Sequence, residues 1–477
     1  MTLPWGDGPP SDRDRLSYAD AEPRPFWLDR DSAPEPLPAL TGRHDAGLAI
    51  VGGGLSGLWA AVLAKEREPS LDVVLLESET IGGGASGRNG GFILSSLTHG
   101  VSNGLSRLDP DEVETLERLG RDNLAETAAT VERLGIDCDL ELTGDVLVAL
   151  EPHEEKELTA EARALRRFGH EVAELDRAAV RAELDSPTFR SGIWVKSSGG
   201  VVDPARLVSG LRRAALGLGV RIHERTRVTG IARRRRGGIE LRASGGTLVA
   251  ERAVLATSAY RSPVAAVRRR IVPVYDYVLV TEPLTAAQRQ AIGWRRRQGF
   301  GDSANQFHYY RLTADDRILW GGYDAIYHYA SRIAPELEDR DASFAVLAQH
   351  FFTTFPQLDG IRFSHRWAGP IDTCSRFFAF YGTSHGGRVS YVAGHTGLGV
   401  GASRFGARVA LGLLDGDVDP RIPARYLRSR PLPFPPEPLR WAAIQLTRSR
   451  LAAADRNQGR RGAWLRLLDR LGLGFDS

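Results

Sequence analysis

The chain has 477 residues, too many for one ordinary hydrophobic core, so two or more domains are expected. Hydrophobic residues make up 42% and charged residues 25%, as in a typical globular protein, and a net charge of +3 argues against a nucleic-acid partner. The two cysteines, Cys138 and Cys374, exclude a disulfide framework, and the sequence contains no C-x-x-C pair that would predict a metal site. The N-terminal sequence lacks the basic and apolar regions of a signal peptide, so the cytoplasm is the expected compartment.

Residues 1–44 are rich in proline and charge and predict an irregular arm on the surface of the first domain. An apolar strand at 48–51 then leads into the turn Gly52-Gly53-Gly54-Leu55-Ser56-Gly57, a helix, a second apolar strand at 73–76 and an acidic residue, Glu77. This order of strand, glycine turn, helix, strand and carboxylate is typical of dinucleotide-binding units.

Each part of this unit has a physical role. Gly52 allows the tight turn, Gly54 lets a pyrophosphate approach the backbone, and Gly57 lets the helix pack against the strand. The helix N-terminus offers free N–H groups to phosphates, and Glu77 is placed to accept hydrogen bonds from ribose hydroxyls. We therefore predict a bound dinucleotide.

The remaining elements follow from hydrophobic periodicity and turn residues. In chain order they are helices at 110–135 and 152–184 with a hairpin at 140–148 between them, a helix at 205–218, a strand at 220–223, an antiparallel ribbon at 226–249, strands at 253–260 and 273–280, a hairpin at 307–322, a helix at 335–355, and a strand and turn at 389–401 followed by a helix at 402–414.

Segments of dinucleotide-binding character thus occur three times, separated by two segments of different composition. This predicts an α/β fold, with a Rossmann-like domain built from discontinuous pieces and a twice-inserted substrate domain built on an antiparallel sheet. The expected nucleotide-binding segments are 45–100, 198–262 and 364–425, the expected substrate-domain segments are 101–197 and 263–363, and residues 426–477 form a C-terminal extension.

Four motifs carry a resemblance to a known superfamily: the glycine unit ending at Glu77, the run Gly84–Gly91, the run Ala256–Tyr260 and the late run Gly394–Gly399. Together they resemble the FAD-dependent amine and amino-acid oxidoreductases of the D-amino-acid oxidase and glycine oxidase superfamily. The Gly84–Gly91 run and the segment Tyr309-Tyr310-Arg311-Leu312-Thr313 look most like the gamma-glutamylputrescine oxidase branch. The resemblance covers about residues 45–425.

The resemblance implies FAD as the cofactor. The Gly84–Gly91 loop would pass the ribityl and pyrophosphate oxygens with Arg88 and Asn89 as donors, and the late glycines would face the flavin pyrimidine oxygen near a helix N-terminus. Because the early loop has no histidine and Cys374 is out of register, we expect FAD to be held non-covalently. The implied FAD-binding residues are Gly52, Gly54, Leu55, Ser56, Gly57, Glu77, Ser86, Arg88, Asn89, Gly90, Gly91, Val228 (through its backbone, at adenine), Thr257, Gly397, Leu398, Gly399 and Val400.

The family reaction moves a hydride from the carbon next to a substrate nitrogen to flavin N5, and the imine then hydrolyses. No dedicated general base is required if the amine binds in its neutral form, so the sequence identifies none. We expect substrate contacts from Arg311, which could bind a carboxylate, with a surface pairing to Asp315 or Asp316 as the alternative. Further candidates for substrate contact are Tyr309, Tyr275, Tyr277 and His395, with core packing as the alternative for Tyr275 and Tyr277.

The partner molecules implied are a small amine or amino acid and an electron acceptor, either oxygen or another molecule. Alternative functions are a flavin-binding subunit that requires a partner chain for catalysis, or a quinone-linked amino-acid dehydrogenase. The segment Leu439–Leu473 combines leucine, tryptophan and arginine residues, and we expect it to dock on the protein rather than on a membrane surface, with a dimer contact as a further alternative.

Overall fold

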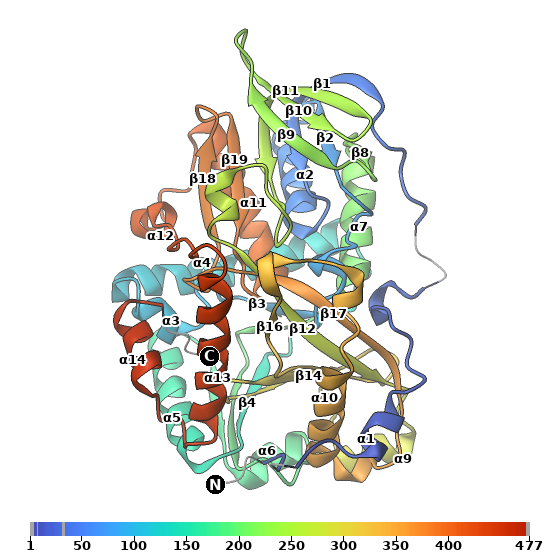
Figure 1. Cartoon of the computed structure of the whole chain (residues 1–477), viewed down its shortest axis with the longest axis vertical. Coiled ribbons are helices and arrows are strands. Elements are labelled where there is room, and N and C mark those ends of the chain that lie inside the picture. Colours follow the sequence, from blue (N-terminus) through green and yellow to red (C-terminus); the bar gives the residue numbers. More distant parts are fainter. Residues whose placement is uncertain (1–3, 7, 31–33, 474–477) are drawn as a thin grey trace.

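The computed structural model describes residues 4–6, 8–30 and 34–473 (Figure 1). Residues 1–3, 7 and 31–33 of the predicted arm and residues 474–477 of the extension lie outside the described residues. The fold is α/β and is built around two large sheets, one in the upper half of Figure 1 and one in the lower half. The class predicted from the sequence is confirmed.

The first sheet has eight strands, in the order β18-β19-β11-β1-β2-β8, with β10 paired to β11 and β9 to β10. The strands from β19 to β8 in this order run parallel, and helices α2, α7 and α11 pack together beside them. All four residues of β2 are buried, as expected for a parallel strand that is covered on both faces. The elements are β1 (Gly42–Val51), α2 (Leu55–Arg67), β2 (Val73–Leu76), α7 (Pro204–Gly217), β8 (Arg221–His223), β9 (Val228–Arg233), β10 (Ile239–Ala243), β11 (Gly246–Leu255), β18 (Phe380–Ser384), β19 (Val389–Ala393) and α11 (Gly399–Asp415).

The second sheet has nine strands, in the order β16-β12-β15-β14-β13-β4-β6-β5, with β17 paired to β12. Its pairings are antiparallel except for β13 with β4. Helix α10 (Asp341–Thr354) packs against β12 and β15. The strands are β4 (Asp145–Ala149), β5 (Val172–Leu175), β6 (Ser191–Val195), β12 (Val272–Thr281), β13 (Gly299–Asp302), β14 (His308–Leu312), β15 (Ile318–Gly322), β16 (Ile326–Tyr327) and β17 (Phe363–Thr373).

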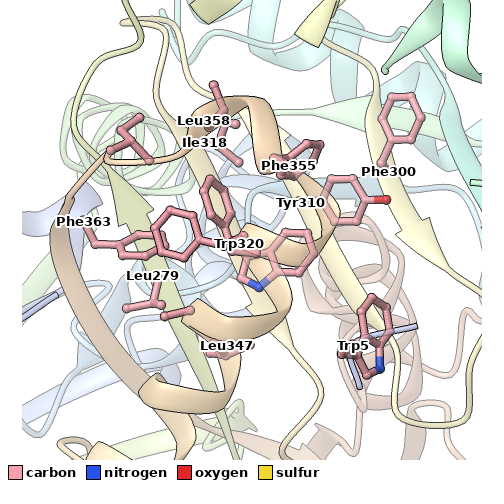
Figure 2. Packing of buried hydrophobic residues seen from close by; sticks show 14 of the residues in the cluster. Trp5, Leu279, Phe300, Tyr310, Ile318, Trp320, Leu347, Phe355, Leu358 and Phe363 are labelled. Atoms are coloured by element: carbon pink, nitrogen blue, oxygen red, sulfur yellow. The ribbon is translucent and has the colours of Figure 1, made fainter. Parts of the chain in front are cut away.

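An aromatic core fills one face of this second sheet. Figure 2 shows Trp320 and Tyr310 among Phe300 and Phe355, with Trp5 of the N-terminal arm at the edge of the cluster. The rings of Tyr310 and Trp320 lie 4.8 Å apart, and both side chains are almost completely buried. Burial of such large side chains on one face leaves the other face of the sheet free to meet the first sheet.

The remaining elements connect and cover the two sheets. They are α1 (Asp12–Ser17), η1 (Phe26–Leu28), η2 (Ala85–Gly87), β3 (Phe92–Leu94), α3 (Val101–Leu105), α4 (Pro110–Arg133), α5 (Pro152–Arg167), α6 (Arg177–Glu183), β7 (Gly199–Val201), α8 (Ala265–Arg268), α9 (Ala286–Ile292), η3 (Tyr329–Ser331), η4 (Pro335–Leu337), η5 (Pro356–Leu358), α12 (Ala424–Arg428), α13 (Leu439–Asp455) and α14 (Ala463–Arg470). Strands β3 and β7 form a separate two-stranded sheet.

Four sequence-based expectations about the fold need correction. The helix expected at 152–184 is interrupted, because residues 172–175 form β5, which pairs with β6. The predicted hairpin at 140–148 does not form, because β4 pairs instead with β6 and β13 inside the second sheet. Strand β17, expected in the nucleotide-binding segment 364–425, pairs with β12 along almost its whole length and so belongs to the second sheet. The N-terminal arm lies largely on the second sheet's core, since α1 packs against α10 and the ring of Trp5 stacks on His350 at 4.8 Å.

The C-terminal extension docks on the second sheet, as favoured from the sequence. The carboxylate of Asp455 accepts hydrogen bonds from the backbone N–H groups of Asn305 (3.0 Å) and Gln306 (3.1 Å), and Glu437 accepts one from the Tyr327 hydroxyl at 2.5 Å. Leu465 on α14 is buried. Among the described residues, no helix is both long enough and apolar enough to cross a membrane.

Candidate active site

The glycine turn after β1 is built so that only glycine fits at two of its positions. Gly52 has a φ of 109°, and a Cβ there would overlap the carbonyl oxygen of Ala256. A Cβ at Gly57 would overlap the carbonyl oxygen of Gly52. Gly54 is the N-cap residue of α2 and has no side chain to occupy the helix N-terminus. The turn therefore leaves the positive end of α2 open to an anion.

Two side chains tie neighbouring segments to this turn. The Glu77 carboxylate accepts hydrogen bonds from the N–H of Gly53 at 2.7 Å and from the N–H of Glu79 at 2.9 Å. The Ser86 hydroxyl accepts a hydrogen bond from the N–H of Leu55 at 2.9 Å. Thr257 follows β11, which is paired to β1 and ends beside Gly52. All of these groups meet at the carboxyl ends of parallel strands, where ligands bind in open α/β sheets.

Val228, the residue predicted to contact adenine, begins β9 and is partly buried. The segment just before Val228 lies beside Glu77, because the N–H of Thr226 donates to the Glu77 carbonyl at 2.7 Å. This places the backbone of Val228 near the carboxylate that is predicted to hold the ribose. Its role at adenine stays a prediction.

The Gly84–Gly91 loop uses its polar side chains to hold its own shape. The Asn89 amide donates to the carbonyls of Ala85 and Ser86, both at 3.0 Å, and its oxygen accepts from the N–H of Gly91 at 2.8 Å. Arg88 donates from Nε to the Gly83 carbonyl at 2.7 Å and forms an ion pair with Glu338 of the inserted segment. Arg88 and Asn89 thus shape the loop, and their donation to FAD stays a prediction.

Two tryptophans fix the outer side of this loop. The Trp27 indole donates to the Asn89 carbonyl and the Trp367 indole donates to the Arg88 carbonyl, both at 2.9 Å. Sequence reasoning missed both contacts, because Trp27 lies in the N-terminal arm and Trp367 lies on β17. Only the aromatic residues in an otherwise polar arm could have signalled a docking role for Trp27.

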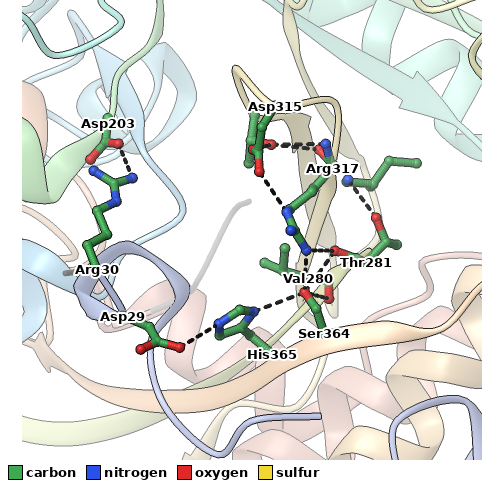
Figure 3. A network of polar contacts seen from close by, with 11 residues as sticks. Asp29, Arg30, Asp203, Val280, Thr281, Asp315, Arg317, Ser364 and His365 are labelled. Carbon is green, nitrogen blue, oxygen red and sulfur yellow. Dashed lines mark hydrogen bonds and ion pairs between the residues drawn. The ribbon is translucent and has the colours of Figure 1, made fainter. Parts of the chain in front are cut away.

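The arm is anchored again directly after Trp27. Figure 3 shows Arg30 paired with Asp203, the N-cap residue of α7, and Asp29 paired with His365 of β17 at 3.1 Å. Arg317 completes this network through Thr281 and Ser364, at 3.1 and 2.8 Å. The arm therefore joins the first sheet's helix layer to the second sheet beside the Gly84–Gly91 loop, which is called the cofactor loop below.

Arg311, the predicted carboxylate ligand, is a completely buried structural residue. Its Nη1 donates to the carbonyls of Gly91 (2.9 Å) and Val202 (2.7 Å), and its guanidinium carbon lies 5.4 Å from the ring centre of Trp27. Burial lowers the pKa of Arg311 to about 9. Arg311 therefore supports the cofactor loop, and the two roles considered from the sequence, substrate contact and surface pairing, are corrected.

The two aspartates considered as surface partners of Arg311 are paired with other arginines. Asp315 pairs with Arg317 at 2.7 Å, and Asp316 pairs with Arg289 at 2.9 Å.

Tyr275 and Tyr277 lie in the core of the second sheet, the alternative left open by the sequence. Both side chains are fully buried, and the Tyr277 hydroxyl donates to the Leu337 carbonyl at 2.8 Å. The tyrosines share a face, as predicted, but it is the face opposite the cofactor loop. An amine cage formed by these two residues is therefore corrected to core packing.

Tyr309 does lie at the cofactor loop. A Cβ at Gly90 would lie 2.6 Å from the Tyr309 ring, and Phe92 packs edge-on against that ring with 5.7 Å between the centroids. The Tyr309 hydroxyl donates to the carboxylate of Asp276 on β12. Burial raises the pKa of Tyr309 well above its usual value, so the phenol keeps its proton. Asp276 was not among the residues predicted from the sequence.

The late glycine run positions the N-terminus of α11. Helix α11 begins at Gly399, three residues before the predicted start, and a Cβ at Gly401 would overlap the Leu94 carbonyl of β3. Gly397 has a φ of 92° and faces open space, with nothing within 4 Å of an added Cβ. Val400 is buried, so it can offer only its backbone. The positive end of α11 thus faces free space, which suits the developing negative charge on a flavin pyrimidine.

His395 links this run to the first glycine turn. Its Nδ1 lies 3.4 Å from Asp372 and its Nε2 lies 3.5 Å from the Ser56 hydroxyl. The N–H of Gly394 also donates to Asp372, at 2.7 Å. His395 therefore lies between the two helix N-termini, and contact with substrate or flavin stays a prediction.

Cys374 is placed for packing. Its side chain is fully buried, and its thiol donates to the Phe378 carbonyl at 3.3 Å. Burial raises the pKa of this thiol, which keeps it protonated and unreactive.

Within the described residues, no group of His, Cys, Asp and Glu side chains could hold a metal ion.

These features fit FAD. The two open helix N-termini suit the pyrophosphate and the flavin pyrimidine ring, and the glycines leave room that any side chain would fill. Residues 48–411 match the family model described as FAD dependent oxidoreductase.

The chain belongs to the FAD-dependent oxidoreductase (DAO) family.

Curated relatives agree with this assignment. The chain is 26% identical over 404 residues to the probable oxidoreductase OrdL of Haemophilus influenzae, an alignment that covers 83% of this chain and 88% of the relative. It is 29% identical over 392 residues to the gamma-glutamylputrescine oxidoreductase of Escherichia coli, with 80% and 87% covered. The resemblance seen in the sequence is therefore confirmed, and the chain is an FAD-dependent oxidoreductase.

Solved structures show the same fold. Glycine oxidase from Geobacillus kaustophilus has a TM-score of 0.67 at 21% identity, covering 81% of this chain and 99% of that one. L-proline dehydrogenase from P. horikoshii has a TM-score of 0.65 at 18% identity, covering 81% and 96%.

Proposed function

We propose that this protein oxidises a C–N bond in a small amine or amino acid and passes the electrons to oxygen or another acceptor. The observation that carries the proposal is the contact between the second sheet and the cofactor loop, where Tyr309 packs on Gly90 and donates its hydroxyl to Asp276. In this arrangement one sheet holds the cofactor and the other presents side chains to the substrate. The E. coli relative is named for an amine substrate, gamma-glutamylputrescine.

When bound, FAD supplies the two-electron acceptor for a hydride from the carbon next to the substrate nitrogen. The chain supplies the rest. Gly52, Gly54 and the N-terminus of α2 bind the pyrophosphate, and Glu77 binds the ribose hydroxyls. The N-terminus of α11 stabilises negative charge at the pyrimidine end. The second sheet covers the reacting atoms and restricts water until the imine product is released to hydrolyse.

The experiment that tests this proposal is an anaerobic titration of the purified yellow protein with amines and amino acids, including gamma-glutamylputrescine, putrescine, glycine and proline. We expect at least one amine to bleach the visible flavin spectrum. Admitting air then tests oxygen as the acceptor, and added quinone tests a dehydrogenase. A flavin that no compound reduces, but that is reduced after a second chain is added, would show that this chain is a subunit and would contradict the proposal.

We also propose that FAD is held without a covalent bond, since Cys374 is buried and bonded to carbonyl oxygens. Precipitating the holoprotein with acid is therefore expected to leave all of the yellow colour in the supernatant. Colour that stays with the pellet after washing would contradict this expectation.

A further inference from the structure

Asp276 projects from β12 toward the cofactor loop. Residues alternate between the two faces of a strand, and its neighbours Tyr275 and Tyr277 point into the aromatic core. Asp276 is directly opposite Gly369 of β17, and a Cβ at Gly369 would lie 3.7 Å from the side chain of Arg88. Since opposed residues of an antiparallel pair share a face, Asp276 lies on the side of the sheet that meets the cofactor loop. The hydrogen bond from Tyr309, which packs on Gly90, places it there independently.

The Asp276 carboxylate lacks a counterion. It forms no ion pair with any residue that the structure describes. Three other carboxylates near this region are paired, Glu338 with Arg88, Asp372 with His395 and Asp324 with Arg340. A charge buried between two domains is normally paired, because desolvation of an isolated carboxylate is costly. Asp276 nevertheless keeps part of its side chain accessible, so a small cation can reach it.

The arginines beside this face are already engaged. Arg88 pairs with Glu338, and Arg311 donates to the carbonyls of Gly91 and Val202. Arg88 is also held by the carbonyls of Gly83 and Ala368. Nη2 of Arg311 has no hydrogen-bond partner among the described residues, but the side chain is completely buried, so a substrate carboxylate does not reach it. The side chain that the second sheet presents to the substrate is therefore a carboxylate, with the Tyr309 hydroxyl fixing its orientation.

We propose that Asp276 binds the ammonium group of the substrate and accepts one proton from it before the hydride leaves the neighbouring carbon, and that the substrate class is an alkylamine selected by its positive charge. This inference deepens the proposed function and rests on it for the identity of the site. Tyr309 is a positioning residue, because it orients the carboxylate through its hydroxyl. An α-amino acid, whose carboxylate would meet Asp276 without an accessible arginine beside it, is expected to be a poor substrate.

The test compares two probes of equal length and opposite charge, n-butylammonium and butyrate, on FAD-loaded protein. Binding is followed by the perturbation of the oxidised flavin spectrum under anaerobic conditions, so it can be read without turnover. We expect the wild-type protein to bind n-butylammonium and not butyrate. In Asp276→Asn, which keeps the shape of the side chain, n-butylammonium is expected to bind about 30-fold more weakly or worse.

The matched control is Asp316→Asn, which removes a carboxylate from an exposed turn of the same sheet. It is expected to bind n-butylammonium like the wild type. An unchanged affinity in Asp276→Asn with a normal flavin spectrum, or wild-type binding of butyrate in place of n-butylammonium, would overturn the inference. Charge-selective binding that depends on Asp276 would support it even if no amine reduces the flavin, in which case the proposed function alone would fail.

A pH profile gives a second readout. Burial raises the pKa of Asp276 to about 6, and the negative charge of Asp324 after β15 adds to the rise. Hydrogen bonds from the Tyr309 hydroxyl on β14 and from the backbone N–H groups of Tyr277 and Gly322 act in the opposite direction. The carboxylate is charged above this pKa and neutral below it, so n-butylammonium binding is expected to weaken as the pH falls through about 6. Asp276→Asn should lack this acid limb, and Tyr309→Phe should move it to higher pH because the carboxylate loses a donor.

Discussion

Replacing Gly52 with alanine is expected to give a protein that does not retain FAD. The residue has a φ of 109°, a conformation that L-residues avoid, and an added Cβ would overlap the Ala256 carbonyl at the end of β11. The turn would have to open, which moves the α2 N-terminus away from the pyrophosphate position. Titration of the purified variant with FAD, followed by fluorescence quenching, measures the loss directly.

Gly217→Ala is the matched control. Gly217 ends α7, and nothing lies within 4 Å of an added Cβ. This variant should bind FAD like the wild type and be equally stable or up to about 1 kcal/mol more stable, since alanine favours helix. A Gly52→Ala protein that binds FAD with wild-type affinity would contradict the assignment of this turn.

Replacing Arg311 with methionine is expected to destabilise the fold by about 3 kcal/mol and to weaken FAD retention. Methionine keeps much of the apolar stem but removes the charged donors to Gly91 and Val202. The Val202 carbonyl then loses its donor, whereas the Gly91 carbonyl still accepts the N–H of Val202 at 2.8 Å. Because Arg311 is sealed behind the cofactor loop, the preference for ammonium over carboxylate probes should not change. Thermal unfolding and FAD titration measure the two effects.

Arg332→Met serves as the control for loss of an arginine. Arg332 is 58% exposed and pairs only across the surface with Glu336, so its removal should change the free energy of unfolding by less than about 1 kcal/mol. If Arg311→Met were as stable as wild type and instead lost affinity for amino-acid substrates, the carboxylate-binding role predicted from the sequence would be restored.

The first half of the cofactor site could be predicted because it is local. Gly52, Gly57 and Glu77 lie within one β–α–β unit, and their constraints act between neighbouring segments. Strand alternation likewise placed Tyr275 and Tyr277 on one face of β12. It could not say which face meets the cofactor, since both faces of this strand are largely buried and only tertiary packing distinguishes them.

The contacts that hold the cofactor loop could not be predicted for a different reason. Trp27, Arg311 and Trp367 all bind main-chain carbonyls, and a carbonyl leaves no signature in the sequence. The partners are also far apart along the chain, with 220 residues between Gly91 and Arg311. The same distance hid the pairing of β17 with β12 and therefore the boundary between the two sheets.

We propose that this chain alone uses FAD to break a C–H bond next to an amine nitrogen. The most direct test is an anaerobic single turnover, in which the oxidised holoprotein is mixed with an alkylamine and the carbonyl product is counted against reduced flavin. We predict bleaching of the flavin together with one carbonyl compound per FAD. Bleaching without a carbonyl product, or a flavin that no amine reduces, would contradict it.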